Sequence, residues 1–259
     1  MSLRGAAFIA GAYEHPRRSI PDRSVAQIHA EVALGALADA GLTLADVDAY
    51  YCAGGIGFGA VSLAEYLGLE LVQVDSTYTG GSSYLVHVGH AAAAIAAGRC
   101  HVALITQGAR TRTEGRVELP AMDAPHYSFE DVYGMSTATN YALVAQRRRY
   151  ELGTTAEQLA EVKVSASLHA QHNEHALLPR PVTVEEVLES PMIADPLHRL
   201  DCCVVTDGGG ALVVVSPEVA RTLPRRCVKL LGHGEAPRHT MGGRSDLLHS
   251  GAVRAGPIA

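Results

Sequence analysis

The first 110 residues alternate between two hydrophobic patterns. Short runs rich in Val, Ile, Tyr and Ala are typical of strands that are buried on both faces. Longer stretches with apolar residues three or four positions apart are typical of helices. The predicted strands are 6–13, 47–55, 69–76 and 101–108, and the predicted helices are 25–40, 61–68 and 82–97. Because strand and helix alternate, we expect an α/β fold with a mixed, mostly parallel sheet and helices on both faces.

The pattern changes after Ala109. Residues 110–135 are polar, rich in turn residues and without a clear period, which predicts an excursion away from the sheet. Strand character returns around 200–216, after a turn at Asp207–Gly210, and this strand is expected to rejoin the first sheet. The predicted helices of the excursion are 137–152, 156–172 and 183–190.

Capping residues support several of these helices. Ser24 is a favourable N-cap for the helix that starts at Val25, and Gly41 suits the left-handed position that ends it. Thr183 with Glu186 three residues later forms a capping-box pattern. For the helix from 156, either Thr154 or Thr155 is a suitable cap, with Glu157 or Gln158 reaching back.

The stretch Asp75–Gly98 predicts a strand end, a Gly-Ser turn and an Ala-rich helix. A helix that starts at such a turn directs its free backbone N–H groups and the positive end of its dipole into one small space, which favours binding of an anion. Ser82 and Ser83 are possible nucleophiles, but the G-x-S-x-G pattern of an activated serine is absent, so N-capping is the favoured role. The stretch contains no cysteine.

Composition and charge exclude several classes of function. The net charge is −6, so no basic field predicts a nucleic-acid partner or an anionic membrane surface. No run approaches the roughly 20 apolar residues that span a bilayer, and the start lacks a signal-peptide pattern. The protein is therefore expected in the cytoplasm. An odd number of cysteines without C-x-x-C spacing argues against a disulfide framework and a zinc site.

Four stretches, in this order and spacing, resemble the thiolase superfamily, and specifically its sterol-carrier-type thiolase and lipid-transfer-protein branch. The first is the Gly80–Ser83 turn with the helix and strand after it, which is similar to the nucleophile helix of the family. The second, "YGMSTATN", is similar to the motif H-M-G-x-T-A-E-N. The others are "LHAQHNEHAL" with "VTVEEVLESPMIADPLHRLDCC", and "TDGGGALVVVS".

The resemblance implies a fold of five layers made of two similar halves, with a loop domain inserted into the first half. Applied to this sequence, it implies an N-terminal thiolase-like α/β domain at 1–110, an inserted loop domain at 111–199, a return strand at 200–224 and the start of the C-terminal half at 225–259. By the same resemblance, the catalytic His and the second Cys of the family belong to a C-terminal half, most of which is expected to be missing from this sequence.

The resemblance also implies an activity and partners. Proteins of this family form or cleave a carbon–carbon bond next to an acyl-CoA thioester, usually as dimers, with coenzyme A as part of the substrate and no covalently bound cofactor. The branch includes aldolases that act on CoA thioesters of steroid side chains together with a small zinc-ribbon and OB-fold partner.

The position of the nucleophilic cysteine of the family corresponds to Gly81, or lies within one residue of it. An acyl-enzyme route requires a thiolate at that position. A retro-aldol reaction needs only a base and a site for an enolate, so it is favoured over thiolysis. Two alternatives stay open. The first is a non-catalytic or degenerate thiolase subunit that needs a partner. The second is an ordinary acetyl-CoA acetyltransferase seen as a fragment.

The catalytic candidates are Gly81 and Ser82 at the helix start and Tyr133, which occupies the place of the motif His. Tyr133 is expected to act as a general acid or as a hydrogen-bond donor to the thioester oxygen, with Tyr127 and Tyr78 lining the same pocket. Packing is the alternative role for tyrosines in an irregular loop.

Three residues are candidates for contact with coenzyme A. Cys203 corresponds to a position that lines the pantetheine channel in related thiolases, and a buried structural thiol is the alternative. Arg147 is expected to attract the CoA phosphates, unless it lies on a solvated helix face, and Met135 belongs to the Tyr133 motif. His87 and His90 have a spacing that suits a metal, but no third ligand is evident, so a metal site is rejected.

Overall fold

The computed structural model describes residues 3–115, 133, 136–237 and 248–259. The chain forms two compact units. The first comprises Met1–Arg116, Thr206–Pro237 and Gly251–Ala259, and the second comprises Val117–Val205 and Arg238–Ser250. The domain limits expected from the sequence, at 110 and 199, lie a few residues before these divisions, and the assignment of 225–259 to a C-terminal half stays a prediction.

The first unit is built on a six-stranded sheet with the order β3-β2-β4-β7-β1-β8. Its strands are β1 (Phe8–Glu14), β2 (Ala49–Tyr51), β3 (Gln73–Asp75), β4 (Val102–Ala109), β7 (Gly208–Val215) and β8 (Val228–Lys229). The strand β2 pairs in parallel with β3 and β4, whereas β7 runs antiparallel to β4 and β1, and β8 runs antiparallel to β1. Four strands therefore point in one direction and two in the other, as expected for a mixed, mostly parallel sheet.

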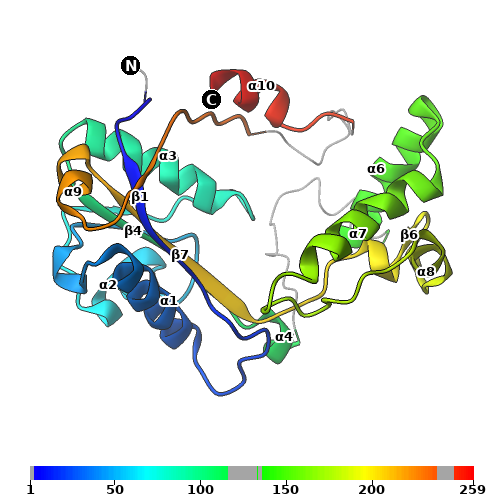
Figure 1. The fold of residues 1–259 in the computed structure, drawn as a ribbon, viewed down its shortest axis with the longest axis horizontal. Helices are drawn as coiled ribbons and strands as arrows, with labels where there is room; N and C mark the ends of the chain where they lie inside the picture. Colours follow the sequence, from blue (N-terminus) through cyan, green and yellow to red (C-terminus); the bar gives the residue numbers. More distant parts are fainter. Residues whose placement is uncertain (1–2, 116–132, 134–135, 238–247) are drawn as a thin grey trace. The chain divides into compact units, whose positions relative to one another are not determined.

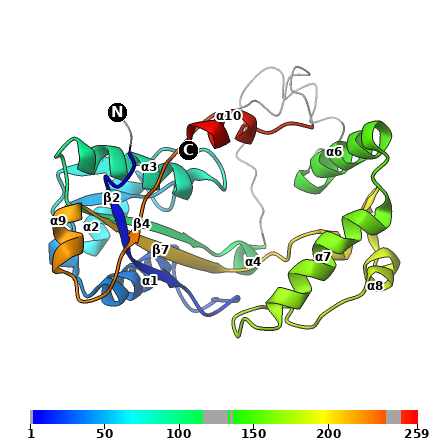
Figure 2. The same ribbon diagram turned by 45° about the horizontal axis from the view of Figure 1, so that its top comes forward.

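Helices cover both faces of this sheet (Figures 1 and 2). They are α1 (Val25–Ala40), α2 (Ala60–Leu67), α3 (Ser83–Ala96) and α9 (Pro217–Thr222). The first unit also contains the short helices α4 (Thr111–Glu114) and α10 (Ala252–Ile258). Because side chains alternate along a strand, Tyr50 of β2 packs with α1 and α2, and the next residue, Tyr51, packs with α3 on the other face. The α/β fold class expected from the sequence is confirmed.

Side chains at the ends of α1 explain its limits. The Ser24 hydroxyl accepts from the backbone N–H of Gln27, and the Gln27 side chain accepts in return from the backbone N–H of Ser24. At the other end Gly41 adopts φ +73°, a conformation that favours glycine, so the helix ends at Ala40. Both signals were visible in the sequence.

Asp207 anchors two distant parts of the first unit. Its carboxylate is buried and accepts hydrogen bonds from the backbone N–H of Ile20 (2.7 Å), the backbone N–H of Thr113 (2.9 Å) and the Thr113 hydroxyl. Burial opposes ionisation, but these donors hold the pKa of Asp207 below its ordinary value. The point at which the chain leaves the first unit is thereby fixed to the point at which it returns.

The segment after β8 lies against α3. A Cβ atom at Gly89 of α3 would come within 2.1 Å of the His233 ring, so only glycine permits this close approach. The His233 ring also forms a hydrogen bond with the Leu85 carbonyl at 3.2 Å. Among the described residues, no helix is long and apolar enough to cross a membrane.

The second unit is mostly helical. Its elements are α6 (Thr137–Leu152), α7 (Ala156–Ala170), α8 (Val184–Glu189), β5 (Met192–Ala194) and β6 (Leu197–His198). Thr155, rather than Thr154, caps α7 with Gln158, and Thr183 caps α8 with Glu186. The Ser167 hydroxyl accepts from the backbone N–H of Val182 at 3.0 Å and ties α7 to the segment before α8.

Candidate active site

The start of α3 is formed by a tight turn. Gly80 has φ +75°, and the hydroxyl of Ser83 donates to the Gly80 carbonyl at 2.6 Å while it accepts from the backbone N–H of Thr79 at 2.8 Å. Ser82 donates to the Thr79 carbonyl at 3.3 Å. Both hydroxyls therefore hold the turn together instead of reaching forward along the helix.

The predicted N-capping by Ser82 or Ser83 is wrong. A capping residue has extended backbone angles that place its side chain over the first turn, but Ser82 adopts helical angles (φ −85°, ψ −3°). Within the described part of the chain, no side chain caps α3. The N–H groups of Ser83 and Leu85 donate to the Gly80 and Ser82 carbonyls at 3.1 Å and 3.0 Å. Within the described residues, the N–H groups of Gly81 and Ser82 have no such partner, so they are left for a ligand that accepts hydrogen bonds.

Space for such a ligand lies beside the two glycines. A Cβ atom added at Gly80 or Gly81 would meet no heavy atom within 4 Å, and Gly81 is exposed. Since the φ angle of Gly81 lies outside the left-handed region, a side chain is sterically possible there. The absence of a cysteine at Gly81 is therefore not imposed by packing.

A carboxylate fixes the segment that precedes this turn. Asp75, the last residue of β3, accepts from the backbone N–H of Thr77 (2.7 Å), the Thr77 hydroxyl (2.6 Å) and the His90 ring Nδ1 (2.6 Å). Burial favours the neutral acid, but the hydrogen bonds from Thr77 and His90 outweigh it and keep the pKa of Asp75 below its ordinary value. Asp75 thus connects the sheet, the turn and the middle of α3.

His87 provides a second connection between α3 and the turn. Its Nε2 lies 3.0 Å from the Thr77 carbonyl, and because a carbonyl only accepts, Nε2 carries the proton. The ring is buried, and it packs against Tyr51 and Tyr84 with centroid distances of 5.8 Å and 6.0 Å. Burial lowers the pKa of His87, so the ring is neutral at pH 7. His87 and His90 therefore have separate protein partners.

The buried cysteines of the first unit do not supply a nucleophile. The Cys52 thiol, just after β2, donates to the Gly54 carbonyl at 3.1 Å, and burial raises its pKa to about 11. Burial and the nearby Asp48 raise the pKa of Cys100 to about 11 as well. At neutral pH both are thiols, and only the thiolate attacks a thioester. Neither buried cysteine therefore replaces the thiolate that an acyl-enzyme route requires.

Tyr78 lies in the first unit and is exposed, and the other sequence-predicted residues belong to the second unit. Tyr133 is 81% exposed, and Cys203 is exposed instead of buried, so the alternative of a buried structural thiol is wrong. Arg147 pairs with Glu151 and lies over the Tyr150 ring, 5.8 Å from its centroid. Met135 and Tyr127 lie outside the described residues. The roles of these residues toward the substrate stay predictions.

Asp75 was not among the site residues predicted from the sequence. One signal for it was present, because an Asp followed two residues later by Thr commonly forms a turn in which the carboxylate accepts the backbone N–H of the second residue. Its bond to His90 joins residues 15 positions apart, and only the folded chain reveals it.

Several known proteins are similar to this chain over most of its length. No family model matches the chain. The chain is similar to a steroid side-chain-cleaving aldolase of Thermomonospora curvata, with 36% identity over 235 residues that cover 86% of this chain and 60% of the relative. The chain therefore spans about 60% of the length of that relative.

Solved structures of similar proteins include an aldolase and a thiolase-like protein. The structure described as "Ltp2-ChsH2(DUF35) aldolase" superimposes with a TM-score of 0.85 and 34% identity, over 95% of this chain and 66% of that chain. A monomeric SCP2-thiolase-like protein type 1 from Mycobacterium smegmatis matches with a TM-score of 0.74 and 24% identity, over 94% of this chain and 53% of that chain. The second match concerns the fold alone.

Proposed function

We propose that this chain, which belongs to the thiolase superfamily, acts on an acyl-CoA. In this proposal it cleaves the carbon–carbon bond next to the thioester in a retro-aldol reaction. One observation carries the proposal. The α3 N-terminus keeps the uncapped N–H groups and free space of an oxyanion site, but it has glycine where an acyl-enzyme route requires a thiolate. The similar aldolase of Thermomonospora curvata supports this chemistry.

The reaction needs no covalent bond to the protein. A base removes the proton of the β-hydroxyl group, the C–O bond becomes a carbonyl, and the Cα–Cβ bond breaks. The electron pair of that bond moves into the thioester and forms an enolate, which finally takes a proton at Cα. Backbone N–H groups at Gly81 and Ser82, held in place by the turn, stabilise the negative charge on the enolate oxygen. Tyr133 is proposed as a general acid or as a hydrogen-bond donor to the thioester oxygen.

Contacts with coenzyme A come from the second unit in this proposal. The substrate brings the CoA moiety with it, so no separate cofactor is required. Arg147 attracts the CoA phosphates, and Cys203 and Met135 contact its pantetheine arm. The exposure of Arg147 and Cys203 supports this assignment, because both side chains are accessible to a ligand.

We also propose that the active protein is an assembly in the cytoplasm. The assembly proposed is a homodimer of this chain with a small partner that has a zinc ribbon and an OB-fold. The description "Ltp2-ChsH2(DUF35) aldolase" of the similar structure supports a partner subunit with a DUF35 domain. All five cysteines are free, as expected for a reducing compartment.

The test uses the protein isolated from its native host, so that any partner subunit is retained. It is incubated with a β-hydroxyacyl-CoA that carries a bulky apolar group on the β-carbon, without free CoA. The expected products are a shorter acyl-CoA and a carbonyl fragment, with no increase in the intact mass of the chain. A strict requirement for free CoA, or an acyl adduct on the protein, would overturn the proposal.

A further inference from the structure

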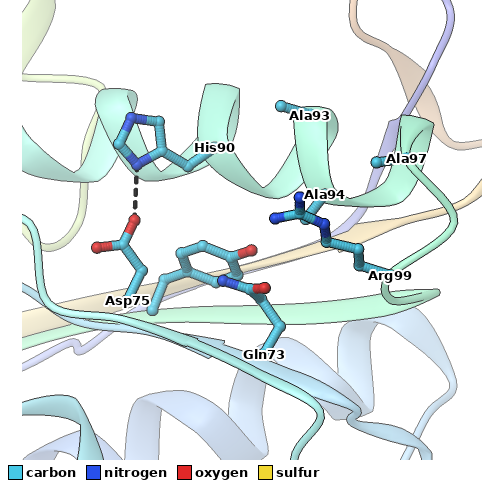
Figure 3. A pocket seen from close by; sticks show the side chains of 8 residues that line it. Gln73, Asp75, His90, Ala93, Ala94, Ala97 and Arg99 are labelled. Atoms are coloured by element: carbon cyan, nitrogen blue, oxygen red, sulfur yellow. Dashed lines mark hydrogen bonds and ion pairs between the residues drawn. The ribbon is translucent and has the colours of Figure 1, made fainter.

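A pocket of about 320 Å³ lies beside the edge strand β3, on the face of the sheet that α3 covers. It lies against the C-terminal half of α3, whereas the candidate active site lies at the N-terminus of the same helix. Figure 3 shows Asp75 and His90 on one side of it and Arg99 on the other, with Gln73 below. Its lining residues are Tyr51, Gln73, Asp75, His90, Ala93, Ala94, Ala97 and Arg99.

The acidic side of the pocket already has its partners. The Asp75 carboxylate accepts from Thr77 and from His90 Nδ1, and Nε2 of the same His90 lies 3.2 Å from the Glu235 carboxylate. The His233 ring lies 3.6 Å from Glu235 as well. The contacts run in series from Thr77 through Asp75, His90 and Glu235 to His233. The polar groups on this side of the pocket therefore have partners without a ligand.

The opposite side has polar groups without partners. Tyr51 is fully buried, and its hydroxyl has no hydrogen-bond partner within the described structure. The guanidinium of Arg99 is turned over the pocket in Figure 3, and no described carboxylate lies within ion-pair distance of it. A buried hydroxyl without a partner is costly and rare in folded proteins, and it points to a ligand that accepts a hydrogen bond.

We propose that this pocket binds a small organic carboxylate, with the carboxylate on Arg99 and Tyr51 and a short apolar tail against α3. The planar guanidinium matches a carboxylate with two parallel hydrogen bonds. Gln73 contributes its amide from the edge of the sheet. Ala93 and Ala97, four residues apart, lie on one face of the helix and offer their methyl groups to the tail.

The charge around the pocket selects a monoanion. Asp75 and Glu235 are carboxylates, and the C-terminal end of α3 adds the negative end of the helix dipole. A phosphate dianion meets twice the repulsion that a carboxylate meets from these groups. The pocket volume lies at the lower end of the range for ligand sites, which fits an acid of a few carbon atoms.

The test is a titration of the purified full chain with sodium butanoate, acetate and phosphate, followed by isothermal calorimetry and by saturation-transfer NMR of the butanoate signals. Butanoate is expected to bind at least fivefold more tightly than phosphate. Arg99→Gln is expected to weaken butanoate binding at least tenfold, and Arg221→Gln, which changes an exposed arginine of α9, is the matched control and leaves it unchanged.

Two further variants check the orientation of the ligand. Tyr51→Phe removes only the hydroxyl and is expected to weaken binding of both acids about threefold to tenfold. Ala97→Leu fills the apolar side and is expected to weaken butanoate binding more than acetate binding. Equal affinity of Arg99→Gln and the wild type for butanoate, or tighter binding of phosphate than of butanoate, would overturn the proposal.

Discussion

The carboxylate of Asp75 and the Nδ1 atom of His90 lie 2.6 Å apart, and this contact joins the end of β3 to the middle of α3. The same carboxylate holds the backbone and hydroxyl of Thr77. Asp75 is thus one of the side chains that position the start of α3, together with His87 and Ser83, although Asp75 itself lies outside the turn. Substitution of Asp75 therefore tests whether the candidate active site depends on the hydrogen bonds that hold Thr77 and His90.

Asp75→Ala is expected to lower turnover at least tenfold and to cost about 1–3 kcal/mol of unfolding free energy, since it removes the acceptor of three hydrogen bonds. Amide hydrogen exchange should accelerate at residues 77–83. Asp46→Ala is the matched control, because the Asp46 carboxylate also accepts from a Thr backbone N–H and hydroxyl, those of Thr43. Wild-type exchange rates at 77–83 in Asp75→Ala would contradict the expectation.

Two adjacent tyrosines are expected to respond in opposite ways to removal of their hydroxyl groups. Tyr50 donates to or accepts from the Thr106 hydroxyl at 2.6 Å, and Thr106 in turn bonds with His29 at 2.7 Å. Tyr50→Phe should cost about 1–2 kcal/mol, because it leaves a buried network incomplete. Tyr51→Phe removes a hydroxyl without a partner and should be neutral or stabilising by up to ~1 kcal/mol. Urea denaturation of both variants measures the difference, and equal destabilisation would disprove it.

His29 makes the stability of the sheet domain dependent on pH. Burial lowers the pKa of His29 to about 4, although a backbone contact with Gly108 opposes the shift. Between about pH 6.5 and pH 4 the unfolded chain binds a proton that the folded chain does not, so stability falls as the pH falls through this window. The loss is on the order of 3 kcal/mol. In His29→Gln the difference between unfolding free energies at pH 7 and pH 5 should shrink, and an unchanged difference would contradict the expectation.

Gly81→Cys tests the electrostatics of the α3 N-terminus directly. The introduced side chain meets no neighbour, and the positive end of the helix dipole is expected to lower the pKa of its thiol below 8. Iodoacetamide should therefore alkylate it about tenfold faster at pH 7 than a thiol introduced by Gly256→Cys, which has equal space near the C-terminal end of α10. Peptide mass spectrometry measures both rates, and equal rates would exclude an anion-stabilising field at Gly81.

Tyr133→Phe is expected to lower turnover on the order of 100-fold with little change in KM, because the hydroxyl acts on the developing enolate and not on substrate binding. Tyr141→Phe changes an exposed tyrosine of α6 and serves as the control. Unchanged turnover in Tyr133→Phe would exclude a catalytic role for this tyrosine.

The sequence predicted the local features of this fold more fully than the distant ones. The limits of α1 follow from Ser24, Gln27 and Gly41, since capping depends on residues only a few positions apart. The position of β7 between β4 and β1, and the two-residue length of β8, depend on contacts between segments far apart in the chain. No periodic pattern carries that information.

In the candidate site too, local features were predicted and features that depend on distant contacts were not. The Gly-Ser turn and the missing cysteine are properties of one short stretch and were predicted. The failure of Ser82 to cap α3 follows from its backbone angles, which the turn at Gly80 imposes. Tyr50 and Tyr51 look equivalent in the sequence. Only the folded chain brings Tyr50 to Thr106, whereas the Tyr51 hydroxyl has no partner within the described structure.

The bonds of Asp207 to Thr113 and Ile20 also bear on how this protein tolerates insertions. The long excursion leaves and re-enters the sheet unit at two points that this one buried carboxylate holds together. The entropy lost on closing a loop grows only with the logarithm of its length. Residues 117–205 can therefore be shortened, extended or exchanged at little cost to the sheet, and differences in substrate choice can evolve in that segment while the strands and α3 stay unchanged.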